Sequence, residues 1–154
     1  MTKPFALQPL LDLAQHQKDS AILKLGQLNQ LQHSAQQKLD MLLGYRKNYQ
    51  ERLQQATQNG MGPAEFRNFQ QFINKLDEAI SQQQKQVEQS KASTQRGRSE
   101  FDTTQRKLKS FDTLQQRHLE QEKQIAAKGE QKILDEHTGR FAAYKMLNDQ
   151  EQPE

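Results

Sequence analysis

The residues of this chain that could carry out chemistry are few and scattered. The chain has four histidines, His16, His33, His118 and His137. No two of them lie four residues apart, the spacing that places two imidazoles on one helix face to bind a metal. Asp135 and Glu136 directly precede His137, so these three side chains would point to different sides of a helix. Without cysteine, thiol chemistry and disulfides are excluded. We predict no catalytic residue, no metal site and no cofactor.

Two glycines close together, Gly60 and Gly62, do not form a phosphate-binding loop, because no Gly-Lys-Ser/Thr sequence follows them. They belong to the stretch NGMGP at 59–63, which combines residues that tolerate a left-handed backbone with a proline suited to a helix start. We predict a turn over 59–63.

The segment before this turn carries a heptad pattern, which is typical of a coiled coil. One set of positions reads Leu11, Lys18, Leu25, Gln32, Leu39, Arg46 and Leu53, and the other reads Ala14, Ala21, Leu28, Ala35, Leu42, Tyr49 and Ala56. The polar members Lys18, Gln32 and Arg46 would set the register of the seam, or face a partner if the seam opens. We predict a first helix over about 5–58.

A second helix is predicted over about 64–148, since no proline interrupts the sequence after Pro63 until Pro153. Its seam follows Phe66, Phe69, Ile73, Leu76, Ile80, Val87, Thr94, Phe101 and Leu108, and weaker positions such as Gln83 and Gly97 lie between them. The short turn makes the two helices antiparallel neighbours. At 1.5 Å per residue they would span roughly 75 and 120 Å, so the second helix overhangs beyond about residue 117.

The composition is compatible with this all-α fold, a long antiparallel two-helix coiled-coil hairpin with a longer second helix. Apolar residues make up 32% of the 154 and there is no tryptophan, too little for the core of an ordinary globular domain. The low apolar fraction would also fit disorder, but the sustained heptads and the abundance of helix-forming residues favour a coiled coil. We therefore expect one coiled-coil domain over 1–154, strongly helical and elongated.

The charge pattern gives little support for a nucleic-acid or membrane partner. The 22 basic and 19 acidic residues are interspersed, leaving a formal net charge of +3. No apolar run approaches the roughly 20 residues of a membrane span, and the N-terminus has no signal-like pattern. We expect a cytoplasmic protein without nucleic-acid binding or direct membrane insertion.

The segment FRNFQQFINKLDEAI at 66–80 carries an unusually wide apolar stripe. Ile73, Leu76 and Ile80 form its centre, while Phe72 and Ala79 project to one flank, about 60 to 80° away. One partner helix does not need so wide a face. Either the phenylalanines close the hairpin core near the turn, or they form a patch that docks another protein.

A resemblance to a known family becomes visible at this point. The stretch MLLGYRKNYQERL at 41–53, with Tyr45 and Tyr49, precedes FRNFQQFINKLDEAI after the turn, and the chain opens with FALQPLLDLA at 5–14. These segments resemble the flagellar type III export proteins of the FliJ family. The resemblance covers residues 5 to about 90; beyond that only length and helical character agree.

The resemblance implies a two-helix stalk similar to the central stalk of rotary ATPases. Such a stalk would bind the flagellar export ATPase, promote assembly of its hexamer, and contact the cytoplasmic domain of the export gate and empty export chaperones. The gate-binding stripe would consist of Phe72, Leu76, Ala79 and Gln83, where family members often have histidine in place of Gln83. The ATPase-facing end would include Leu10, Leu11, Ala14, Lys18 and Ala21, together with the C-terminal overhang.

The resemblance also implies a peripheral position at the cytoplasmic face of the inner membrane, at the flagellar basal body, and no enzymatic activity of the chain itself. Three other classes stay open. The first is a coiled-coil scaffold unrelated to flagella, and the second is the equivalent stalk of a virulence type III secretion system. The third, a basic coiled coil that binds nucleic acid, is disfavoured by the interspersed acidic residues.

Overall fold

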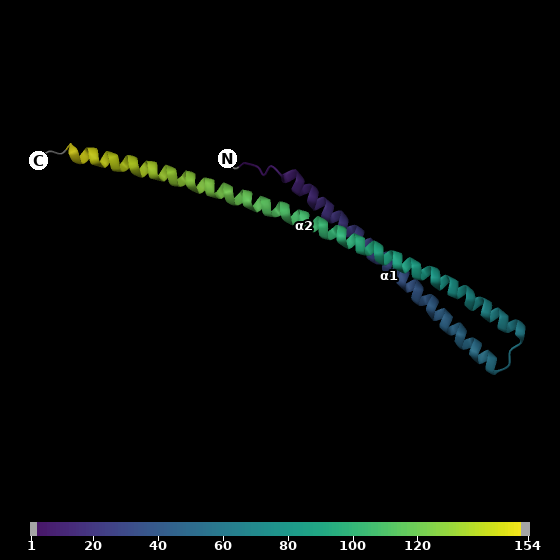
Figure 1. Ribbon diagram of the computed structural model, residues 1–154. Coiled ribbons are helices and arrows are strands. Elements are labelled where there is room, and N and C mark those ends of the chain that lie inside the picture. The colour runs from purple at the N-terminus through teal and green to yellow at the C-terminus, as the bar shows by residue number, and fades with distance from the viewer. Residues whose placement is uncertain (1–2, 152–154) are drawn as a thin grey trace. The chain divides into compact units, whose positions relative to one another are not determined.

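The computed structural model describes residues 3–151 and consists of two helices over this range (Figure 1). Helix α1 is Gln8–Gln58 and helix α2 is Pro63–Gln150, with 51 and 88 residues. This confirms an all-α fold with two packed helices, the second longer. Helix α1 begins three residues later than predicted, because Phe5 to Leu7 form a turn in which the Phe5 carbonyl oxygen accepts a hydrogen bond from the Gln8 amide at 3.1 Å.

The loop between the helices follows from its residue types. After the Asn59 amide bonds to the Gln55 carbonyl oxygen, Gly60 takes a φ of +89°, a conformation that favours glycine and ends the helix. Pro63 is the first residue of α2, where its missing amide hydrogen is not needed. The Gly62 carbonyl oxygen then accepts the first bond of α2 from the Phe66 amide at 3.1 Å. The predicted turn over 59–63 is thus one residue longer than the observed loop.

Contacts divide the chain into two compact units. The hairpin unit is Gln15–Arg106, and the terminal unit joins the start of the chain, to Ala14, with the segment from Lys107 onward. Each unit contains part of both helices. The single domain expected for 1–154 stays a prediction, and the two units are described in turn.

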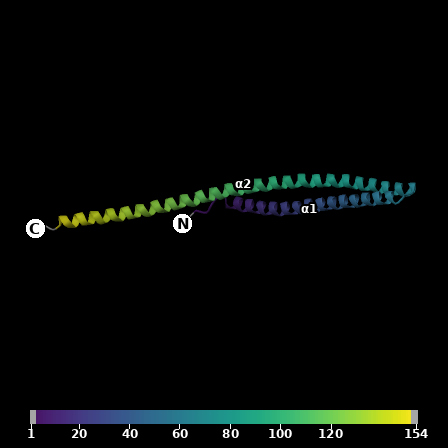
Figure 2. The same cartoon turned by 90° about the horizontal axis from the view of Figure 1, so that it is seen from below.

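In the hairpin unit the two helices run antiparallel from the loop (Figures 1 and 2). Arg46 pairs with Asp77, and Lys24 pairs with Glu100, so the residue number falls along α1 as it rises along α2. The core is a narrow seam, as the heptads predicted. Its buried centre is Leu39, Ile80 and Val87, with Ala35 and Leu42 packed against them.

The middle of this seam is held together by small and polar residues. The Gln83 amide nitrogen donates to the Ala35 carbonyl oxygen at 2.9 Å, and the Thr94 hydroxyl donates to the Leu28 carbonyl oxygen at 3.3 Å. A Cβ added to Gly97 would lie 2.6 Å from the Leu28 Cδ1 atom. Gln83 and Gly97, two seam positions that look weak in the sequence, therefore lie where the two helices approach closely.

The terminal unit has a short seam followed by an uncovered helix. Leu11 and Ala14 of α1 are buried against Leu108 of α2, and Phe111 packs beside them. Beyond His118 only Glu122 is partly covered among the described side chains, and all those from 123 to 151 are exposed. Within this unit, the part of α2 expected to overhang beyond residue 117 thus contacts the start of the chain at its first residues, where His118 meets Lys3 and Phe5.

Candidate functional site

An aromatic patch lies beside the loop of the hairpin unit. We define it as Tyr45 and Tyr49 of α1 with Phe69 and Phe72 of α2. The Tyr49 ring stacks on Phe72 with centroids 4.2 Å apart and tilts against Phe69 at 5.4 Å. Tyr45 and Phe72 keep 52% and 41% of their surface exposed. Tyr49, a heptad position of α1, thus meets Phe69 and Phe72 of α2 across the two helices.

The patch borders a shallow pocket of about 380 Å³, lined by Tyr45, Tyr49 and Phe72 with Asn48 and Arg52. Tyrosine and arginine are among the residue types most enriched at the positions that contribute most to binding in protein interfaces. Phe72 stacks on Tyr49 beside the loop, as expected for a residue that closes the hairpin, and it keeps part of its surface exposed. Its docking of another protein stays a prediction.

The predicted gate-binding stripe divides between the surface and the seam. Phe72 is exposed and Ala79 is half-buried, whereas Leu76 is buried with 8% exposure. Gln83 is 9% exposed, and its amide is bound to the Ala35 carbonyl oxygen. The structure therefore offers Phe72 and Ala79 directly, while Leu76 and Gln83 support them from the seam. Their role in binding stays a prediction.

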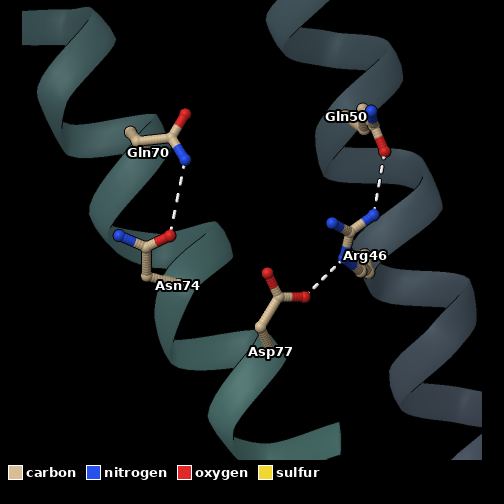
Figure 3. Close-up of polar contacts among 5 residues, drawn as sticks. All are labelled: Arg46, Gln50, Gln70, Asn74 and Asp77. Atoms are coloured by element: carbon tan, nitrogen blue, oxygen red, sulfur yellow. Dashed lines mark hydrogen bonds and ion pairs between the residues drawn. The ribbon is translucent and has the colours of Figure 1, made fainter.

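A polar cluster flanks the patch on the same two helices (Figure 3). The Arg46 Nε atom donates to Asp77 Oδ1 at 2.5 Å, and Arg46 also donates to Gln50 Oε1 at 3.0 Å. The hydrogen bond to Asp77, together with its negative charge, raises the pKa of Arg46. On α2, Gln70 donates to Asn74 at 3.4 Å. Arg46 thus links the two helices, an arrangement compatible with a register-setting role, and which of the two roles the polar heptad positions play stays a prediction. Lys18 and Gln32 are half-buried.

The predicted ATPase-facing residues fall in both units. Leu10, Leu11 and Ala14 belong to the terminal unit, and Lys18 and Ala21 belong to the hairpin unit. Leu10 is 45% exposed, while Leu11 and Ala14 are seam residues with 8% and 2% exposure. Of the three in the terminal unit, Leu10 is the one that offers surface to a partner.

The start of the chain packs on α2 through contacts that sequence reasoning missed. His118 Nε2 lies 2.9 Å from the Lys3 carbonyl oxygen, and its ring lies 5.7 Å from that of Phe5. Nearby, the Gln115 amide donates to Gln8 Oε1 at 3.0 Å. None of these three contacts follows from heptad spacing, because all of them depend on where α1 stops covering α2.

The exposed part of α2 carries many large apolar side chains for a surface helix. Each is at least 55% exposed: Leu119, Ile125, Ile133, Leu134, Phe141, Tyr144, Met146 and Leu147. We call this set the terminal apolar surface. Leu119, Ile133 and Tyr144 lie within about 40° of one another around the helix, at 100° per residue. Exposed large apolar side chains in such number make this part of α2 a candidate for protein association.

The described residues give no indication of other chemistry. Between residues 3 and 151, no three histidine, cysteine, aspartate or glutamate side chains come together in a way that could hold a metal ion. Over the same range, neither helix has a stretch apolar and long enough to cross a membrane.

Comparison with known proteins decides the family. Residues 2–147 match the family model described as Flagellar FliJ protein. The chain belongs to the FliJ family. This result confirms the resemblance and extends it past residue 90, into the part of α2 where the sequence showed no specific motif.

Curated relatives agree with this assignment. The Flagellar FliJ protein of Salmonella typhi is 30% identical over 145 residues, and that of Escherichia coli strain K12 is 28% identical over the same length. Each alignment covers 94% of this FliJ family member and 99% of the relative.

A solved structure shares the fold. It is that of a putative YscO homolog from Chlamydia trachomatis, with a TM-score of 0.52 and 16% identity, covering 97% of this chain and 99% of the other. The family itself consists of non-catalytic export components. This FliJ family member is accordingly a component of flagellar type III protein export.

Proposed function

We propose that the chain links the flagellar export ATPase to the export gate without catalysing a reaction itself. Two surfaces of different character support this function, one in each unit. The aromatic patch, with Phe72 exposed beside Ala79, would bind the cytoplasmic domain of the gate. The terminal apolar surface, together with Leu10 and the start of α1, would bind the ATPase and promote assembly of its hexamer.

The observation that carries the proposal is the exposure of Phe72. A phenylalanine that stacks on Tyr49 and keeps 41% of its surface open is already held in one orientation. A partner that covers it gains apolar burial without ordering a loose side chain. The gate is proposed as the partner because the gate-binding stripe that the resemblance implies begins at this residue.

Three finer features belong to the same proposal. The chain would contact empty export chaperones, for which we assign no residues. It would lie peripherally at the cytoplasmic face of the inner membrane, at the flagellar basal body. It would use neither a cofactor nor a nucleic-acid partner.

A reconstitution with purified proteins tests this function. The chain is mixed with the export ATPase and with the gate's cytoplasmic domain, separately and together, and complexes are separated by gel filtration. We expect a binary complex with each partner, a ternary complex with both, and faster ATP hydrolysis by the ATPase when the chain is added. Failure to bind either partner, or mutually exclusive binding, would contradict a linking role.

A stalk of a virulence secretion system is the second candidate, and the fold that the chain shares with the putative YscO homolog supports it. Deletion of the gene in its own organism separates the two. Loss of motility with intact secretion of virulence effectors supports the flagellar function, and the opposite result supports the alternative.

A further inference from the structure

A groove runs along the hairpin unit between α1 and α2. On α1 it is bordered by Leu31, Ala35, Lys38 and Leu42, which follow one helix face at spacings of three and four residues. On α2 the border runs from Ala79 to Ser90, again along one face. The groove has a volume of about 810 Å³ and opens on one side of the hairpin.

The shape of this groove suits a helix. Side chains at spacings of three and four form ridges, and a third helix packs by laying its own ridge between two others. From Ala79 to Ser90 the groove spans about three helical turns, roughly 16 Å at 1.5 Å per residue. Its floor combines the half-buried apolar side chains of Ala35, Leu42 and Ala79 with Gln83, which is buried and already bonded to the Ala35 carbonyl oxygen. A helix satisfies its own backbone hydrogen bonds and can therefore cover such a floor, whereas an extended strand leaves backbone groups unpaired.

The charge of the groove is one-sided. Its lining includes two cations, Lys38 and Lys85, and no aspartate or glutamate; the other polar groups are four glutamines and a serine. Over the described residues, neither lysine forms an ion pair. The neighbouring carboxylates do not reach the groove: Asp40 accepts a hydrogen bond from Gln36, and Glu78 is exposed outside the lining.

We infer that this groove takes an acidic amphipathic helix of about three turns from a partner protein, packing as a third helix. Its apolar face would cover Ala35, Leu42 and Ala79, and carboxylates on its two edges would pair with Lys38 and Lys85. The inference rests on the proposed function in one respect. Ala79 belongs to both surfaces, so we expect the helix to come from a partner that also covers Phe72.

The test uses synthetic peptides, so that it does not depend on the gate. The probe is an alanine-rich helical peptide of about five turns with leucines on one face and glutamates along its edges. One control peptide carries lysines in place of the glutamates, and a second is acidic with a central proline that breaks the helix. Binding to the full chain is measured by fluorescence anisotropy. We expect the acidic helix to bind at least tenfold more tightly than either control.

Charge reversal locates the contact. Lys38→Glu with Lys85→Glu should weaken binding of the acidic helix at least tenfold and strengthen binding of the lysine peptide. Both side chains are exposed, so the fold should be unchanged. Lys47→Glu is the matched control: this lysine is exposed on α1 outside the groove and should have no effect.

The outcomes separate this inference from the proposed function. Equal binding of the acidic and lysine peptides, no binding of either, or an equal loss in the Lys47→Glu control would overturn the groove as an acidic-helix site. Gate binding by the native chain in that case would leave the proposed function intact. Conversely, selective binding of the acidic helix without any gate binding would support the groove and refute the gate as partner.

Discussion

Phe72 shows how one residue serves both the fold and a surface. Its ring stacks on Tyr49 across the two helices, while 41% of its surface stays open. Its neighbour Ile73 points into the seam and is only 6% exposed. The two adjacent side chains therefore give a sharp comparison between a surface aromatic and a core aliphatic residue.

We predict that Phe72→Ala lowers the free energy of unfolding by about 1 kcal/mol, the value of an aromatic pair. Ile73→Ala should cost about 2 to 5 kcal/mol, because it leaves a cavity in the seam. Urea unfolding of both variants measures the difference. If the two variants lose equal stability, Phe72 is a core residue and its exposure has no bearing on binding.

Gly97 and Gly44 make a second comparison, between a close helix contact and open surface. A Cβ at Gly97 meets Leu28, whereas nothing lies within 4 Å of one at Gly44. We predict that Gly97→Leu destabilises the hairpin unit by about 1 to 3 kcal/mol, because overpacking forces the helices apart.

The control variant Gly44→Leu should be stabilising by up to about 1 kcal/mol, since leucine favours the helix more than glycine does. Thermal and urea unfolding report both changes. Similar effects of the two substitutions would show that the helices do not approach closely at Gly97.

At the scale of the elements, helix α2 changes character along its length. Its seam residues are covered from Phe69 to Phe111, although Phe66, which the sequence also places in the seam, is 46% exposed. From residue 123 on, every described side chain is exposed. Gly129 and Gly139 in the exposed part each lower helix propensity by about 1 kcal/mol relative to alanine. Without packing, a helix is stabilised only by its propensity and local side-chain pairs.

We therefore predict faster amide hydrogen exchange in α2 beyond Arg117 than in α1 between Leu25 and Leu53. Exchange followed by mass spectrometry on the isolated chain gives this profile. Adding the export ATPase should slow exchange over the terminal apolar surface if that surface binds it. Equal protection of both segments in the isolated chain would show that the exposed helix has a partner in solution, such as a second copy.

The sequence predicted the elements well because their signals are local. The heptads and the NGMGP turn placed both helices to within three residues at each end. What it could not predict are contacts that depend on the distance between helices. The sequence places Gln83 at a weak seam position and in the gate-binding stripe, but it does not predict that the Gln83 amide donates to the Ala35 carbonyl oxygen across the seam. The packing of Phe5 on His118 likewise depends on where α1 begins, which heptad spacing does not specify.

At the scale of the whole molecule, we propose that the two units bind different partners. The gate is assigned to the aromatic patch of the hairpin unit and the ATPase to the terminal apolar surface. Because the two surfaces share no residue, each should be removable without loss of the other. Phe72→Ala removes the exposed ring of the first. The double substitution Ile133→Ala, Tyr144→Ala removes two side chains of the terminal apolar surface, which are 67% and 68% exposed.

The most direct test measures the affinity of both variants for both partners by isothermal titration calorimetry. We predict that Phe72→Ala weakens binding to the gate's cytoplasmic domain by about tenfold or more, the effect of losing roughly 1.4 kcal/mol or more, and leaves ATPase binding unchanged. The Ile133→Ala, Tyr144→Ala variant should show the reverse. If either variant weakens both interactions equally, or if neither weakens its assigned partner, the division of partners between the two units is wrong.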